Sequence, residues 1–427
     1  MNILLRGMLR ASVSVIVVLC SSRALSQDSV CAGEAPCPAL GLSASYTVDW
    51  RRNMTGGVET GTALSGLLDV GATWTSDRLL PGAWVTSTVS VIHTGGGAIS
   101  GRYVGDLQGL NNIEAPEGLR LYELWSEISF GARGAVSSRV GFLDLNAEFD
   151  APVTSGFFIG PPFGIGTDLA QTGENGPAVF PVTALGVRIA GRLGETLRWR
   201  AAAFDGLPGS PDRASFLSLS ASGRQGALMI GELEYVPAGF NKLAVGAWSY
   251  TASFELVDGA ARGDDSRHKG NRGAYAMVDL PLVHLGAARL DGTLRIGGAA
   301  GDYNAVSRYI GAGLVVSHLS DSRPDDAVGI AVAHGRTGAA FRRAMAFEGA
   351  TPLKSETQVE LTWRAPLRSW LAIVPGVQWV NNPGADAALR DAWVAGLRFE
   401  MSFDHNWPLL ARQTDLEPNA PLVMTTP

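Results

Sequence analysis

Charged side chains of both signs recur at alternate positions along short, half-apolar segments of this chain. If these segments are strands, alternate residues point to one face, so the charges would line a single polar surface. A guanidinium group only donates hydrogen bonds and a carboxylate only accepts them, so a mixed lining can bind hydroxyl groups in both directions. Both signs occur, unlike the single-sign rings of an ion filter; a generic hydrated surface is the alternative. The candidates are Asp49, Arg51, Asp69, Glu123, Glu127, Arg188, Arg198, Arg200, Glu232, Glu234, Arg295, Glu356, Glu360, Arg398 and Glu400.

Aromatic residues gather in the longest segment without strand alternation, residues 146–180. Phe149, Phe157, Phe158 and Phe163 stand there among glycines and prolines. If this loop folds inward it would narrow a pore, and its aromatic rings could stack on the C–H face of a sugar. A surface loop packed on itself is the other interpretation.

Catalytic and metal chemistry find little support. Glu123 and Glu127 resemble a carboxylate pair, but residues four apart on a strand lie about 13 Å from each other, beyond the roughly 5–9.5 Å that glycoside hydrolysis requires. The chain has six histidines and no GxSxG elbow. Cys31 and Cys37 have no nearby histidine partners and instead predict a small disulfide loop in an oxidising compartment. We therefore expect no enzyme, no metal site and no cofactor.

Alternation of apolar and polar residues identifies the elements that position the charges. Between 355 and 364, Thr357, Val359, Leu361 and Trp363 share one face, opposite Glu356 and its even-numbered neighbours. About ten residues of alternation bounded by turn residues is typical of membrane-spanning barrel strands. Sixteen such segments predict an all-β, sixteen-stranded antiparallel transmembrane barrel, wide enough for an aqueous channel. They are 43–52, 62–76, 83–94, 119–130, 136–145, 181–191, 197–204, 226–235, 242–254, 273–282, 291–300, 308–318, 327–336, 355–364, 370–380 and 391–403.

The connections between these segments alternate in length. Even connections, such as 131–135 and 192–196, are short, whereas odd ones, such as 95–118 and 146–180, are mostly longer. Outer-membrane barrels have short periplasmic turns and longer extracellular loops. The tryptophans near segment ends fit the aromatic girdles of such a barrel, and a soluble core is the alternative for them. They are Trp50, Trp74, Trp84, Trp199, Trp363, Trp370, Trp379 and Trp393.

The first 26 residues have the pattern of a cleaved secretory signal. Arg6 and Arg10 precede an uncharged stretch, and Ala24-Leu25-Ser26 supplies the small residues of a cleavage site. The predicted organisation is a signal peptide (1–26), an N-terminal periplasmic segment (27–41), a barrel (42–403) and a tail (404–427). No other segment offers the about 20 apolar residues of a membrane helix, so export and low charge favour the bacterial outer membrane.

The composition argues against a disordered chain and against a nucleic-acid-binding protein. Only 17% of the 427 residues are charged and 46% are hydrophobic, whereas soluble domains average about 25% charged and disordered chains carry more charge still. The formal charge of −6 becomes −9 when the signal's three arginines are removed, because 31 basic residues then face 40 acidic ones. A net negative chain has no electrostatic footprint for nucleic acid.

Several motifs resemble the carbohydrate-selective porin family of bacterial outer membranes. SGRYVGDLQGLNNIEAP (100–116) is followed by RLYELW (120–125), GPAVFPVTALGVRI (176–189), AAFDGLPGSPD (202–212), ETQVELTWRA (356–365) and VNNPGA (380–385). The matches extend in order over nearly all of the chain after the signal. The resemblance implies a sixteen-stranded, sugar-permeable channel with charged and aromatic residues around a constriction. The motif positions it brings to the pore are Arg102, Asp106, Glu114, Arg120, Glu123 and Glu127.

Arg120 falls on the apolar-facing parity of its predicted strand. One feature departs from the family pattern: residues 404–427 continue beyond the terminal aromatic Phe403 without a strand pattern. The sequence thus predicts passive diffusion of small sugars, with monosaccharides as the solutes, through a barrel embedded in outer-membrane lipid. A general diffusion porin, an adhesive barrel and, from a different class, a hydrolase are the alternatives, and the oligomer is a homotrimer or a monomer.

Overall fold

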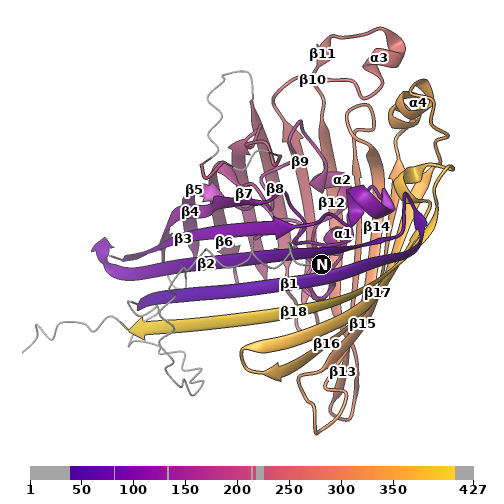
Figure 1. Cartoon of the computed structure of the whole chain (residues 1–427). Helices are drawn as coiled ribbons and strands as arrows, with labels where there is room; N and C mark the ends of the chain where they lie inside the picture. Colours follow the sequence, from indigo (N-terminus) through magenta and orange to yellow (C-terminus); the bar gives the residue numbers. More distant parts are fainter. Residues whose placement is uncertain (1–38, 81, 132–133, 213–214, 218–225, 409–427) are drawn as a thin grey trace, which may run out of the picture.

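The computed structural model describes residues 39–80, 82–131, 134–212, 215–217 and 226–408 (Figure 1). The predicted signal peptide, the Cys31–Cys37 pair and residues 409–427 lie outside the described residues. Sixteen strands form one closed antiparallel barrel, which confirms the predicted fold class. They are β1 (Ala39–Gly57), β2 (Gly61–Leu80), β3 (Ala83–Gly96), β4 (Gly118–Phe130), β5 (Val136–Leu143), β6 (Ala184–Leu193), β7 (Leu197–Asp205), β8 (Ala227–Tyr235), β9 (Lys242–Tyr250), β12 (Arg272–Leu285), β13 (Ala288–Ala299), β14 (Val306–Ser317), β15 (Ala327–Thr337), β16 (Ser355–Arg368), β17 (Leu371–Asn381) and β18 (Arg390–Pro408).

The barrel closes between its first and last strands. β1 pairs with β18 from Ala39 opposite Pro408 to Gly57 opposite Arg390. Both strands therefore extend beyond the predicted barrel bounds of 42 and 403, and the expectation that no strand pattern follows Phe403 is wrong for residues 404–408. Residues 404–408 pair because the edge of β1 from Ala39 to Ser43 is available there. Their pairing leaves no unpaired backbone at the seam.

Side chains alternate between the two faces of the wall. On β16, Glu356, Gln358 and Glu360 are each 1% exposed on the inner face, whereas Leu361 is 52% exposed on the outer face. β18 repeats the pattern, with Arg398 inside and Phe399 outside. Apolar residues face outward because they meet lipid, and the inner face is free to be polar.

The two ends of the barrel differ in their connections. At the end that holds Ala39 and Pro408, here named the turn end, strands are joined by short turns such as 194–196 and 286–287. At the opposite loop end, the connections 97–117, 144–183, 206–226, 251–271 and 338–354 are long, although 58–60 is short. The length alternation thus follows the prediction except at the loop-end connections 58–60 and 300–305, which are short, and at the turn-end connection 318–326, which is longer than the other turns.

Short helices belong to the connections at the loop end. No helix in the described part of the chain has the length and apolar character needed to cross a membrane. The helix α2 contacts strands β13 and β14 of the wall, and α3 contacts α4 beyond the loop end (Figure 1). These elements are η1 (Ser100–Val104), η2 (Ser155–Phe157), α1 (Pro161–Gly164), α2 (Thr167–Ala170), α3 (Gly259–Arg262), α4 (Ala339–Phe347) and η3 (Pro383–Ala385), with the two-stranded sheet β10 (Phe254–Glu255) and β11 (Arg267–His268).

Candidate functional site

The connection 144–183, here named the inner loop, lies inside the barrel and is held there by carboxylates of the wall. Glu360 on β16 accepts hydrogen bonds from the backbone N of Ile159 at 2.7 Å and of Gly160 at 2.8 Å. Asp279 on β12 accepts them from the backbone N of Val153 at 3.0 Å and of Thr154 at 2.9 Å. Each carboxylate satisfies two successive amides, and charge-assisted bonds of this kind are the stronger ones.

A buried arginine fixes the other end of the inner loop. Arg295 on β13 pairs with Asp150 at 3.0 Å from Nε to Oδ1 and 2.6 Å from Nη2 to Oδ2, and it also pairs with Asp168. Its guanidinium lies 5.0 Å from the ring centre of Tyr309. A Cβ atom at Gly166 would lie 2.1 Å from Cζ of Arg295, so glycine is what permits this approach. Both acids come from the loop and the cation from the wall, which makes the loop part of the barrel interior.

The aromatic residues of the inner loop serve as packing groups. Phe158 and Phe163 are each 3% exposed, with ring centres 5.2 Å apart, and pack with Ala331 and Ala333. Their rings therefore do not face the channel, contrary to the interpretation that they could stack on a sugar; the reason is that the wall opposite them is made of small residues that the rings fill. Phe157 stays partly exposed.

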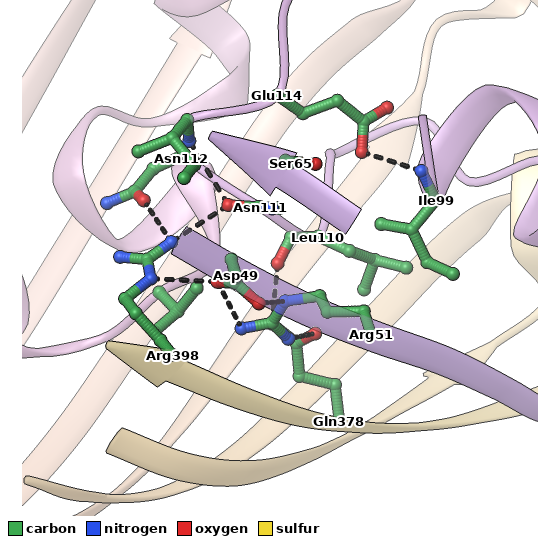
Figure 2. A network of polar contacts seen from close by, with 12 residues as sticks. Asp49, Arg51, Ser65, Ile99, Leu110, Asn111, Asn112, Glu114, Gln378 and Arg398 are labelled. Atoms are coloured by element: carbon green, nitrogen blue, oxygen red, sulfur yellow. Dashed lines mark hydrogen bonds and ion pairs between the residues drawn. The ribbon is translucent and has the colours of Figure 1, made fainter. Parts of the chain in front are cut away.

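A second buried network closes the seam between β1 and β18. Asp49 accepts from Nε of Arg398 at 2.7 Å and pairs with Nε of Arg51 at 3.0 Å, while Arg51 donates to Gln378 at 2.5 Å (Figure 2). Arg398 is 4% exposed. Although its side chain points inward as predicted, it is covered and does not contact the channel.

Figure 2 shows what covers Arg398: Asn111 and Asn112, from the connection 97–117, each accept a hydrogen bond from its Nη2 at 2.8 Å. In the same connection, Glu114 accepts from the backbone N of Ile99 at 2.9 Å. Burial raises the pKa of Glu114 to about 7. These contacts make the connection 97–117 a second segment folded onto the inner wall.

Glu356 ties that segment to β16. Its carboxylate accepts from the backbone N of Leu107 at 2.7 Å, of Gln108 at 3.1 Å and of Gly384 at 2.8 Å. Asp106, which the family motif brings to the pore, accepts from the backbone N of Gly109 at 2.6 Å, and burial raises its pKa to about 6. Asp106 and Glu114 therefore shape the loop rather than stand in open water.

A β-bulge decides which residues of β4 face inward. The pairing of β3 with β4 shifts by one residue at Tyr122. Arg120, before the bulge, is buried and donates to Thr94 at 2.7 Å, while Glu123 and Glu127, after it, also face the interior. The expectation that Arg120 lies on the apolar face is wrong because an inserted residue reverses the alternation.

Two groups of ion pairs lie along β4 to β9 and are joined where Arg200 donates to the backbone O of Glu148. Glu127 pairs with Arg139 at 2.9 Å and with Arg188 at 2.5 Å; both arginines also pair with Glu148 of the inner loop at 2.8 Å. Further along, Arg200 pairs with Glu232 at 3.8 Å. This set is named the charged row, and its members are Glu127, Arg139, Glu148, Arg188, Arg198, Arg200, Glu232, Glu234 and Lys242.

Exposure differs within the charged row. The side chains of Glu127, Arg139 and Glu148 are 17%, 18% and 21% exposed, whereas Arg188 is 5% exposed. Arg139 lies over the ring of Trp125, with Cζ 3.8 Å from the ring centre, and Trp125 donates to Glu123 at 3.2 Å. The partly open part of the row is thus one guanidinium between two carboxylates, on an aromatic support.

The predicted site residues fall into separate groups. Glu123, Glu127, Arg188, Arg198, Arg200 and Glu232 come together in or beside the charged row, and Arg198 is its exposed end. Arg102 is 69% exposed at the loop end and lies 3.7 Å from Glu59. The sequence reasoning missed Arg139, Glu148, Lys242 and Trp125. Trp125 shares parity with Glu123 and Glu127, and this signal could have identified it.

Hydroxyl groups line the wall beside the row. On β2 and β3, Thr73 lies 3.0 Å from Thr88 and Ser90 donates to Asp69 at 2.7 Å. A cavity of about 890 Å³ opens at the turn end, with Ser45, Arg364 and Glu400 in its lining. In the described part of the chain no cluster of three or more histidine, cysteine or acidic side chains could hold a metal ion.

The profile of the carbohydrate-selective porin, OprB family, matches residues 60–403. The chain belongs to the carbohydrate-selective porin family. Porin B of Pseudomonas aeruginosa is 23% identical over 253 residues, which are 52% of this chain and 56% of Porin B, so the alignment spans about half of that relative. The porin family and its barrel fold also place this chain in the bacterial outer membrane, and they identify a channel rather than an enzyme.

Solved porins share the architecture. The structure of Pseudomonas putida OprB at high pH has a TM-score of 0.76 and 20% identity, and the match covers 86% of this chain and 94% of that one. The outer-membrane channel DcaP of Acinetobacter baumannii has a TM-score of 0.52 and 11% identity, covering 85% and 97%. At these sequence identities, the similarity to the solved structures concerns the fold alone.

Proposed function

We propose that this porin lets small sugars, and monosaccharides in particular, diffuse passively across the outer membrane, past the open part of the charged row. The observation that carries the proposal is the partial exposure of Glu127, Arg139 and Glu148, whereas Asp49, Arg51 and Arg398 at the seam are sealed. Glu127 and Glu148 accept hydrogen bonds, and Arg139 between them donates hydrogen bonds. This arrangement suits a sugar, because each of its hydroxyl groups can both donate and accept.

The balance of signs supports a neutral solute. Four carboxylates and five cations make up the charged row. Mixed charges at this spacing largely cancel at a distance, so the lining attracts neither sign of ion strongly. A sugar exchanges water hydrogen bonds for bonds to the row at little net cost, which permits both entry and exit.

Liposome swelling tests the proposal with the intact porin. We expect glucose to enter faster than amino acids of similar size, and we expect glucose to reduce single-channel current in planar bilayers. In Arg139→Ala the block by glucose should weaken about fivefold, as expected for the loss of about 1 kcal/mol from a partly exposed contact. Arg52→Ala is the control and should leave the block unchanged, because Arg52 lies on the outward face of β1 and not in the channel.

Two outcomes favour other functions. Equal swelling rates for glucose and amino acids overturn the sugar preference and identify a general diffusion porin. Absence of conductance steps overturns transport altogether and leaves an adhesive barrel. Chemical cross-linking of the purified protein distinguishes a homotrimer from a monomer.

A further inference from the structure

Two arginines face outward at the loop end of neighbouring strands. On β14 the outer face carries Leu314, Ile310 and then Arg308; on β15 it carries Ile330, Val332 and, beyond His334, Arg336. The apolar residues are 38–50% exposed, as lipid-facing residues are, and both arginines are exposed. The arginines therefore stand where the apolar belt ends and the polar interface begins.

His334, two residues before Arg336 on β15, also lies where the apolar belt ends. His334 also faces outward, and its Nδ1 lies 2.8 Å from Oγ1 of Thr357 on β16. A polar pair in this place satisfies itself across two strands, whereas charged groups in the centre of a lipid-facing wall cost several kcal/mol. The outer surface thus changes from apolar to polar to cationic along β15.

Arg308 and Arg336 are direct cross-strand partners, and nothing in the protein neutralises them. Their Cα atoms pair in the register of β14 and β15, with Gly298 beyond Arg308 and Ser355 beyond Arg336. Neither guanidinium makes an ion pair or a hydrogen bond with any residue of the described part of the chain. Like charges directly opposite each other on a sheet destabilise it.

An acid in the connection that precedes β14 faces another arginine. Asp302, in the connection that precedes β14, lies 4.0 Å from Arg262. Two strands from Arg308, the outward residue of β12 is Arg272, another exposed arginine without an ion pair among the described residues. The patch is therefore cationic across β12 to β15.

We propose that Arg308 and Arg336 bind a phosphate group of an anionic lipid headgroup at the loop end of the barrel. The planar guanidinium binds phosphate oxygens through two parallel hydrogen bonds, and an anionic group between the two arginines removes their repulsion. Anionic headgroups attract arginines that lie at the membrane surface. This site requires only the membrane-embedded barrel and is independent of which solute crosses it.

Native mass spectrometry of the purified porin in detergent, titrated with diphosphorylated lipid A, tests the proposal. We expect Arg308→Gln/Arg336→Gln to lower the affinity for lipid A at least about tenfold, because each guanidinium supplies charge-assisted bonds. Arg52→Gln is the matched control: Arg52 is an exposed, outward-facing residue near the loop end of β1, and three strands, β18, β17 and β16, separate β1 from β15. It should leave the affinity unchanged.

Three results overturn the site. They are unchanged lipid A affinity in the double variant, an equal loss in Arg52→Gln, and displacement of lipid A by an equimolar amount of inorganic phosphate, which identifies a free anion as the ligand. Heat-modified migration on gels reports whether each variant is a folded barrel. If the double variant does not fold, Arg308→Lys/Arg336→Lys keeps the charge, and it should still lose affinity because it lacks the paired donors.

Discussion

Glu360→Gln is the substitution that most directly tests how the inner loop is held. The carboxylate of Glu360 is 1% exposed and accepts four hydrogen bonds: from the backbone N of Ile159 and Gly160, from the hydroxyl of Thr362 at 2.6 Å and from Nε2 of Gln378 at 2.8 Å. Glutamine has nearly the same shape but replaces one acceptor oxygen by an NH₂ donor. One of the two loop amides must then face a donor.

The size of the effect follows from these contacts. Losing one charge-assisted hydrogen bond costs about 1.5–3 kcal/mol, and leaving a buried amide without an acceptor costs about 1–3 kcal/mol. Together they weaken the attachment of the loop by about 3–5 kcal/mol. Because 1.4 kcal/mol is a factor of ten, the open population of the loop around residues 157–163 should rise more than about 100-fold.

Amide hydrogen exchange measures that opening. Peptides covering 157–163 should exchange more than about 100-fold faster in Glu360→Gln, and single-channel recordings should show more open-channel noise. Glu400→Gln is the control, since Glu400 also faces inward but pairs with the exposed Arg364 at 2.9 Å and not with the loop. Unchanged exchange in Glu360→Gln, or equal acceleration in Glu400→Gln, would refute the view that this carboxylate holds the loop.

Three further predictions concern other parts of the interior. Gly166→Ala should lower barrel stability by about 1–3 kcal/mol, measured by heat-modified migration, because its Cβ would meet the fixed guanidinium of Arg295; Gly156→Ala, whose Cβ would meet nothing within 4 Å, is the control. Burial raises the pKa of Glu114 to about 7, so the folded state favours its protonated form; this stabilisation is present below the ordinary pKa of the group and is lost as pH rises through about 7. After correction for the intrinsic pH dependence of amide hydrogen exchange, the amides of 97–117 should exchange more slowly at pH 5.5 than at pH 8. Glu114→Gln should abolish this difference. Deleting Tyr122 removes the bulge and leaves Arg120 and Glu123 two residues apart on the same inward face, so the barrel should still fold in detergent with Arg120 buried; a lost folded yield would contradict this.

The amino-acid sequence by itself determined the strands. Alternation has a period of two residues and is therefore a local property, legible within each ten-residue window, as Glu356 to Trp363 illustrates. The number of strands, their outward apolar faces and the length difference between the barrel ends were all available in this way. The strand ends were less certain, and the residues 404–408 paired only because β1 supplied a partner edge.

The tertiary structure alone decided which inward charges are sealed and which stay open to the channel. Glu360 and Arg398 have the same alternating pattern as Glu127, but the first two are covered by segments about 200 and 290 residues away in sequence, through Ile159 and Asn111. Arg120 likewise faces inward only because Tyr122 forms a bulge. Alternation specifies the face of a residue, whereas its exposure depends on where distant loops fold, and a local pattern carries no information about that.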